Sequence, residues 1–185
     1  MMKLLALRCP VCETPLTPGE EDIVILCPEC RSPLHIGDEG LSRINVQYAV
    51  PTARAGVTQW QPFWIFQGQV KILKRTTQSG RSQQNAAQKM WAQPRRFYVP
   101  AWNLSLHTAQ EIGSRMIELQ HIYQTIAQPT NAELTPVVLS AEDAAKLLEF
   151  IVLAIEARRS DWLTDFQFTL DLGQPELWAL PTSQD

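Results

Sequence analysis

Four cysteines near the start of the chain constrain its fold more than any other feature. They are the only cysteines in 185 residues, and they form two Cys-x-x-Cys pairs that fourteen residues separate. A Cys-x-x-Cys segment folds into a tight turn in which both sulfurs face one point. Two such turns supply the four thiolates of a tetrahedral zinc site. The sequence therefore predicts one structural Zn²⁺ whose ligands are Cys9, Cys12, Cys27 and Cys30.

Three other uses of the cysteines are weighed against zinc. Disulfides are disfavoured, because the spacing suits a metal and the N-terminal apolar stretch is too short for an export signal. A thioredoxin-like redox pair needs a βαβ context that the sequence lacks. A rubredoxin-type iron site is disfavoured, because rubredoxins separate their two cysteine pairs by a longer insertion. Metal analysis of the purified protein would decide between zinc and iron.

The residues around the cysteines indicate a module too small to hold an apolar core. Between the pairs, residues 17–20 have turn chemistry and residues 23–26 form a strand-like apolar run. A bound metal would replace the core, with a binding free energy of about 10–16 kcal/mol. We expect a zinc β-ribbon over residues 1–40 and a second domain over residues 41–185.

These cysteine turns resemble the paired rubredoxin-type knuckles of the zinc-ribbon superfamily. The resemblance covers residues 6–36 and is clearest in the segment Ile-Val-Ile-Leu-Cys-Pro-Glu-Cys. It implies a metal and a fold, but no activity. Zinc ribbons often place glycine after the second cysteine of a knuckle, whereas this chain has Glu13 and Arg31. Residues 62–66, Pro-Phe-Trp-Ile-Phe, are similar to a strand in uncharacterised bacterial zinc-ribbon proteins.

Charge is segregated along the chain. From residue 40 to residue 110 there are nine Lys and Arg and no Asp or Glu, whereas from residue 131 onward ten acids face three bases. Residues 1–36 hold five acids against three bases. Because four thiolates exceed the charge of Zn²⁺, the first module is acidic, which disfavours its contact with nucleic acid.

The basic middle of the chain also contains most of the aromatic residues. Basic and aromatic side chains together can bind nucleic acid, anionic lipid or a protein. They can equally form a core whose basic face meets the acidic C-terminal third. The candidate interaction patch comprises Trp60, Trp64, Lys71, Lys74, Arg75, Arg95, Arg96 and Trp102.

The spacing of apolar residues, together with the turn and capping residues between them, predicts an α+β domain, with a mostly antiparallel sheet and two helices packed on one face. We expect a mobile polar loop at about 75–90, because that segment is rich in Gln and Ser and has no apolar period. One helix is expected from a capping box at Thr108 to Pro129, and another after Ser140. Expected strands lie at 43–50, 63–73, 96–100 and 134–139, and residues 166–180 are expected to form a hairpin.

No catalytic constellation is visible in the sequence. The glycines are dispersed and form no phosphate-binding loop, and a four-cysteine metal site leaves no open coordination position. The sequence therefore favours a non-enzymatic, cytoplasmic zinc-ribbon adaptor or accessory subunit that binds a partner protein. The alternatives are nucleic-acid binding through residues 54–102 and peripheral binding to an anionic membrane, without a transmembrane segment.

Overall fold

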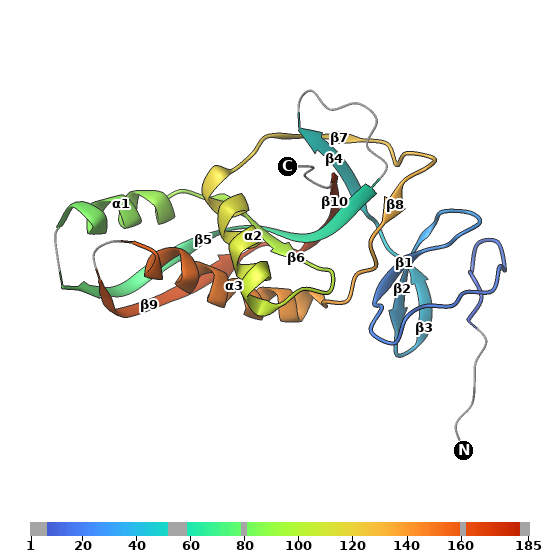
Figure 1. The fold of residues 1–185 in the computed structure, drawn as a ribbon, viewed down its shortest axis with the longest axis horizontal. Helices are drawn as coiled ribbons and strands as arrows, with labels where there is room; N and C mark the ends of the chain where they lie inside the picture. The colour runs from blue at the N-terminus through green and yellow to red at the C-terminus, as the bar shows by residue number, and fades with distance from the viewer. Residues whose placement is uncertain (1–6, 52–58, 79–80, 160–161, 182–185) are drawn as a thin grey trace, which may run out of the picture.

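One long strand, β5 (Gln59–Thr77), organises the body of the protein (Figure 1). The computed structural model describes residues 7–51, 59–78, 81–159 and 162–181. The larger sheet has the strand order β6-β5-β10-β4-β7, and β8 and β9 also pair with β5. Its other strands are β4 (Gln47–Pro51), β6 (Arg95–Pro100), β7 (Tyr123–Ile126), β8 (Glu133–Leu134), β9 (Leu163–Leu172) and β10 (Glu176–Pro181).

A separate three-stranded antiparallel sheet carries the cysteine module. Its strands are β1 (Val24–Leu26), β2 (Pro33–Gly37) and β3 (Gly40–Arg43). The fold class is α+β, which confirms the prediction, and the larger sheet is mixed because β10 pairs with β4 and β8 with β5 in parallel. The small sheet extends to Arg43, across the predicted domain boundary at residue 40; the division into 1–40 and 41–185 stays a prediction.

The predicted C-terminal hairpin is wrong. Both β9 and β10 are strands, but each pairs antiparallel with β5 and not with the other. β9 pairs with residues 68–77 of β5 and β10 with residues 60–65, and the Gly173 N–H between them donates to Gln67 O at 2.7 Å. The two strands are therefore consecutive parts of one ladder along β5. Gly68 fits there because a Cβ would collide with the Asp171 carbonyl oxygen.

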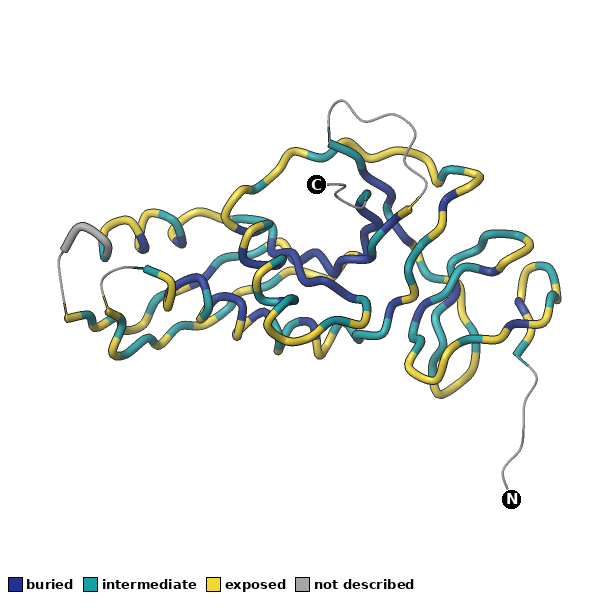
Figure 2. Tube along the Cα trace, viewed as in Figure 1, coloured by how far each residue is buried: buried dark blue, intermediate teal, exposed yellow. Residues whose placement is uncertain are grey.

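The sheet curls until its two edge strands approach each other. The rings of Tyr98 on β6 and Tyr123 on β7 have centroids 6.3 Å apart. The core includes Trp60, Ile65 and Leu180, all at most 2% exposed, and Figure 2 shows the buried trace concentrated along the middle of this sheet. The aromatic run in β5 forms a strand because such side chains pack well on a pleated, buried surface.

Two helices pack against each other and lie over β6, namely α2 (Leu106–Leu119) and α3 (Ala141–Ala157). The N-cap of α3 is Ser140, as predicted, and its hydroxyl accepts from the Asp143 N–H at 3.0 Å. The N-cap of α2 is Ser105 instead of Thr108. The helix ends ten residues before Pro129, because the chain turns to form β7 against β4. No described helix has both the length and the apolarity needed to span a bilayer.

A third helix, α1 (Arg81–Trp91), replaces most of the polar loop predicted at about 75–90. β5 also continues into that segment, as far as Thr77. The helix buries only two side chains among those described, Ala87 and Trp91, one turn apart. A single buried turn gives too weak a periodic signal to recognise in the sequence, so tertiary contacts determine this helix.

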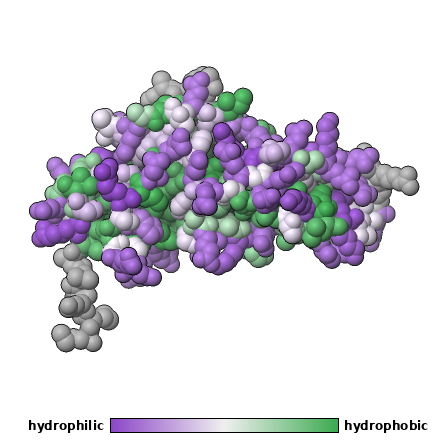
Figure 3. All heavy atoms as spheres, turned by 180° about the vertical axis from the view of Figure 1, so that it is seen from behind, coloured by the Kyte–Doolittle hydropathy of each residue, from purple (hydrophilic) through white to green (hydrophobic). Residues whose placement is uncertain are grey.

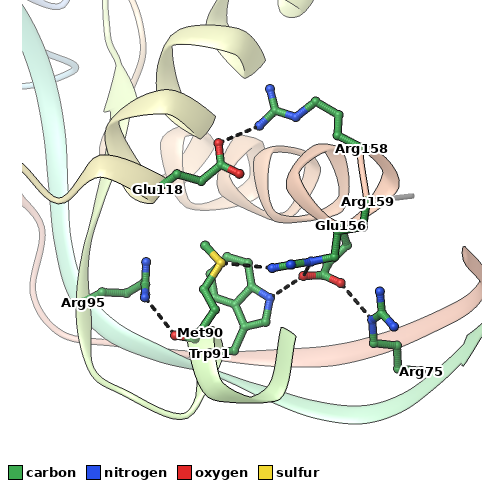
Figure 4. Close-up of polar contacts among 8 residues, drawn as sticks. All are labelled: Arg75, Met90, Trp91, Arg95, Glu118, Glu156, Arg158 and Arg159. Atoms are coloured by element: carbon green, nitrogen blue, oxygen red, sulfur yellow. Dashed lines mark hydrogen bonds and ion pairs between the residues drawn. The ribbon is translucent and has the colours of Figure 1, made fainter. Parts of the chain in front are cut away.

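The contact that holds α1 is a buried charge cluster around Glu156 (Figure 4). Its carboxylate is 0% exposed and accepts from the Trp91 indole N–H at 2.7 Å. The same carboxylate pairs with Arg75 at 2.9 Å and with Arg159 at 2.8 Å. Glu156 thereby joins α3, β5 and α1. Sequence reasoning missed this cluster, because Arg75 and Glu156 lie 81 residues apart.

We expect Glu156→Gln to lower the free energy of unfolding by about 3–5 kcal/mol, because it removes the buried charge that compensates two arginines. Trp91→Phe removes one hydrogen bond, worth about 1–3 kcal/mol, and also shrinks a buried ring, so it should cost more than the hydrogen bond alone. Urea unfolding measures both. The control is Glu118→Gln, which breaks an exposed ion pair with Arg158 and should cost less than about 1 kcal/mol. A Glu156→Gln cost no larger than that of the control would contradict this role.

Candidate metal centre

The two Cys-x-x-Cys turns have matching backbone geometry. In the first turn, the Cys9 N–H donates to Thr14 O and the Glu13 N–H donates to Cys9 O, each at 2.9 Å. The second turn repeats both bonds at 3.0 Å, eighteen residues further along the chain. The Val11 N–H also points at Cys9 Sγ, at 3.4 Å. Each turn therefore directs its cysteines to one side, as the sequence predicts for a metal knuckle.

The residues that replace the usual glycine adopt the left-handed conformation. Glu13 has φ of 62° and Arg31 has φ of 59°. A side chain in this region costs about 1–2 kcal/mol, which explains why glycine is common there. Glu13 and Arg31 thus adopt the backbone conformation that favours glycine, at the cost of local strain.

The four cysteine sulfurs converge. Cys9 Sγ lies 3.6 Å from Cys30 Sγ, and Cys12 Sγ lies 3.5 Å from Cys27 Sγ. All four sulfurs lie within 4.8 Å of one another. In a tetrahedral site with metal–sulfur bonds of about 2.3 Å, sulfurs lie about 3.8 Å apart, so this arrangement can hold one metal ion.

The surroundings of the thiols differ in how well they stabilise a thiolate. The Ser32 hydroxyl lies 3.3 Å from Cys30 Sγ, and its hydrogen bond lowers the pKa of Cys30 to about 6. The Thr14 hydroxyl, 3.3 Å from Cys12 Sγ, lowers the pKa of that cysteine in the same way. Burial instead raises the pKa of Cys27 to about 11. A bound cation would hold that buried thiol deprotonated, so metal binding and the ionisation of Cys27 are linked.

The module is anchored to the body by backbone hydrogen bonds. The chain at Val137, which follows β8, pairs with β1: the Val137 N–H donates to Val24 O at 3.0 Å, and Ile23 N–H donates to Val137 O at 2.6 Å. The Gln128 side-chain amide donates to Arg31 O at 2.8 Å, which ties the second knuckle to the chain before β8. The module also has its own small core, made by Leu16, Leu34 and the buried cysteines.

The structure scatters the residues of the predicted interaction patch. Trp60 and Trp64 are at most 7% exposed, and Trp102 packs edge-on against Phe63. The basic residues of β5 meet acids from the C-terminal third of the chain. The three pairs are Lys71–Asp171, Lys74–Asp165 and Arg75–Glu156.

The two remaining basic residues of the patch lie on β6. The Arg95 guanidinium stands over the Trp91 ring at 5.5 Å, and that of Arg96 over the Trp178 ring at 5.2 Å. Residue 54, the first basic residue of the predicted 54–102 segment, lies outside the described residues. The patch stays a prediction; within the described residues, its aromatic rings are mainly core and its lysines are paired.

Comparison with family models, curated proteins and solved structures returns no match. The metal centre therefore rests on the geometry of its four cysteines.

We expect Glu13→Gly to raise the free energy of unfolding by about 0.5–1 kcal/mol. Relief of the left-handed strain, about 1–2 kcal/mol, exceeds the extra chain entropy that glycine loses, about 0.5–1 kcal/mol. The Glu13 side chain is exposed, so its removal costs no packing. Thermal unfolding of the metal-loaded protein measures the change. Glu13→Ala is the control, since it keeps the strain, and an equal gain from alanine would show that strain is not the cause.

Proposed function

We propose that this chain is a zinc-ribbon adaptor, an accessory subunit of the cytoplasm that binds a partner protein. The geometry of the four cysteines supports zinc, because a site of four soft thiolates with no further ligand suits a structural Zn²⁺. Reduced thiolates require a reducing compartment, which supports the cytoplasm. The zinc would have a structural role, since four protein ligands leave no position for a substrate.

The observation that carries the adaptor proposal is a two-stranded arm with exposed apolar side chains. The arm consists of residues 68–77 of β5 and the paired β9, and it extends away from the body at the end opposite the cysteine module (Figure 1). Leu73 is 66% exposed on it, and Trp162, next to its end, is 75% exposed. Seen from behind, hydrophobic side chains show at several places on a mainly hydrophilic surface, one of them toward the arm (Figure 3).

Exposed aromatic and apolar side chains on a projecting element favour contact with another protein, because Trp is enriched among the residues that dominate binding energy. The two alternatives receive less support. The nucleic-acid alternative is assigned to residues 54–102, where stacking on bases needs accessible rings, whereas Trp60, Trp64 and Trp91 of that segment are at most 7% exposed. The paired lysines of β5 also leave less positive charge for phosphates.

The zinc proposal predicts one zinc per purified chain by metal analysis, and loss of that zinc in Cys27→Ser. His35 lies on β2 outside the sulfur cluster, so His35→Ala serves as the control that keeps zinc. Chelation should increase amide exchange of β1 and β2 at least about 100-fold, because the ligand-linked stabilisation is lost. Iron in place of zinc, or zinc retained in Cys27→Ser, would contradict the assignment.

The adaptor proposal predicts a stoichiometric partner protein in quantitative affinity purification from nuclease-treated native lysate. Leu73→Ser combined with Trp162→Ser should weaken binding of the purified partner at least about tenfold, because buried apolar anchors dominate such interfaces. The matched control is Phe150→Ser with Leu153→Ser, which alters exposed apolar residues on α3. The proposal fails if no stoichiometric protein is recovered, or if the arm and control variants bind the partner equally.

A further inference from the structure

The outer edge of β9 has no strand beside it among the described residues. β9 pairs with β5 alone, and in Figure 1 it forms the margin of the arm. The other side of the arm differs, because α1 lies beside β5 there and the Gln69 side-chain amide donates to Ala92 O. In the described part of the chain, the arm therefore presents β9 as its open edge.

The contacts with β5 show which backbone groups of β9 face outward. The Gly173 N–H donates to Gln67 O at 2.7 Å, and the Asp171 carbonyl oxygen faces Gly68. Alternate residues of a strand direct their N–H and C=O to opposite edges, so the odd-numbered residues from 165 to 171 face β5. The backbone groups of Phe166, Phe168 and Leu170 therefore point outward. No hydrogen bond joins them to another group in the described ranges.

This edge lacks the devices that commonly protect exposed edge strands, which are brevity, basic residues, proline and bulges. β9 has ten residues and contains no Lys, Arg or Pro. A register shift in the β5–β9 ladder places its extra residue on β5, so β9 is regular from Asp165 to Leu172. By contrast, β3 and β7 have four residues each, and β6 begins with two arginines and ends in proline. β9 is therefore a template for a further strand.

Side chains along β9 alternate between an apolar row and a polar row. The apolar row packs against the core and comprises Phe166, Phe168, Leu170 and Leu172. The polar row comprises Asp165, Gln167, Thr169 and Asp171. It holds two carboxylates and no cation, and the Asp171 side chain is 71% exposed. A neighbouring strand would complement both rows if it placed apolar residues on the first face and Lys or Arg opposite the two aspartates.

A second copy of β9 would fit this edge less well than a basic strand. If two copies paired antiparallel about Phe168, Asp165 of each would lie opposite Asp171 of the other. In any register, the two central strands would hold four carboxylates and no cation. Like charges on facing strands are destabilising, so the charge of β9 favours a different chain as its neighbour.

We propose that the partner protein docks on the arm by adding an extended segment to the outer edge of β9. This inference rests on the proposed adaptor function and identifies the chemistry of the partner segment. That segment has alternating apolar residues, with Lys or Arg opposite Asp165 and Asp171, and its backbone pairs with the outward N–H and C=O groups. The exposed side chains of Leu73 and Trp162 belong to the same arm, so they and the edge would form one interface.

The test is NMR titration of the full-length, metal-loaded protein with a capped peptide, Lys-Val-Thr-Val-Thr-Val-Lys. Its lysines have the same separation as Asp165 and Asp171, and its sequence reads the same in both strand directions. The peptide should bind with a Kd of about 1 mM or tighter. At about 5 mM peptide, the amides of Phe166, Phe168 and Leu170 should exchange with solvent about fivefold more slowly. The odd-numbered amides between them should not change, because they already bond to β5.

Two further peptides separate the causes of binding. A copy with every backbone amide N-methylated keeps the charges and side chains but cannot donate backbone hydrogen bonds, and it should bind at least about tenfold more weakly. A copy with Glu in place of both lysines should bind at least about fivefold more weakly, because like charges then face each other.

A variant of the protein tests the charge complementarity from the other side. Asp165→Asn combined with Asp171→Asn should weaken binding of the lysine peptide about threefold to tenfold. The matched control is Asp38→Asn, which alters an exposed aspartate in the turn between β2 and β3 and should change nothing. Circular dichroism checks folding, and the peptide comparisons keep the test valid if the double variant fails to fold.

Three results would overturn this inference. The first is unchanged exchange of the outward amides at about 10 mM lysine peptide, a concentration well above the expected Kd. The second is equal binding of the N-methylated copy. The third is slowed exchange of the same amides when the protein is concentrated without peptide, which would assign the edge to a second copy. The adaptor proposal fails separately, by the absence of a partner protein that depends on Leu73 and Trp162.

Discussion

The backbone hydrogen bonding of β5 is the constraint on which the rest of the body depends. This strand of 19 residues pairs with β6, β8, β9 and β10, and Glu156 of α3 and the ring of Trp102 contact it from outside the ladder. Between residues 63 and 68, β5 has β6 on one side and β10 or β9 on the other, and this pairing on both sides fixes the register of these partners. The curl of the sheet and the arm both follow from where the partners of β5 begin and end.

Local chemistry made some features predictable and others not. The four-cysteine centre follows from two turns whose sulfurs must face one point, and the start of α3 follows from Ser140 and its neighbouring acids. By contrast, α1 depends on the Trp91–Glu156 hydrogen bond, which joins residues 65 positions apart. The hairpin predicted at residues 166–180 failed for the same reason. Its turn residues were recognised correctly as an interruption, but both flanking strands find a longer and more apolar partner in β5.

The segregation of charge in the sequence has two outcomes in the fold. On β5, the basic residues meet acids from β9 and α3, so charges far apart in the chain compensate each other. On β6, the Arg95 and Arg96 guanidiniums instead stand over tryptophan rings, and that of Arg95 also donates to the carbonyl oxygens of Ile117 and Met90. A charge count along the sequence cannot distinguish these outcomes, because the partner of each basic residue is set by strand pairing.

The hydrogen bonds between Val24 and Val137 couple the two parts of the protein thermodynamically. Val24 is fully buried and belongs to the same apolar cluster as the residues of the large sheet. Loss of the metal would therefore reach beyond the cysteines, because any loosening of β1 uncovers Val137 and part of the main core. By mass action, the free metal concentration would set part of the stability of the whole chain. A chain shortened to begin after β3 would likewise expose an unpaired backbone edge at Val137, and with it a tendency to aggregate.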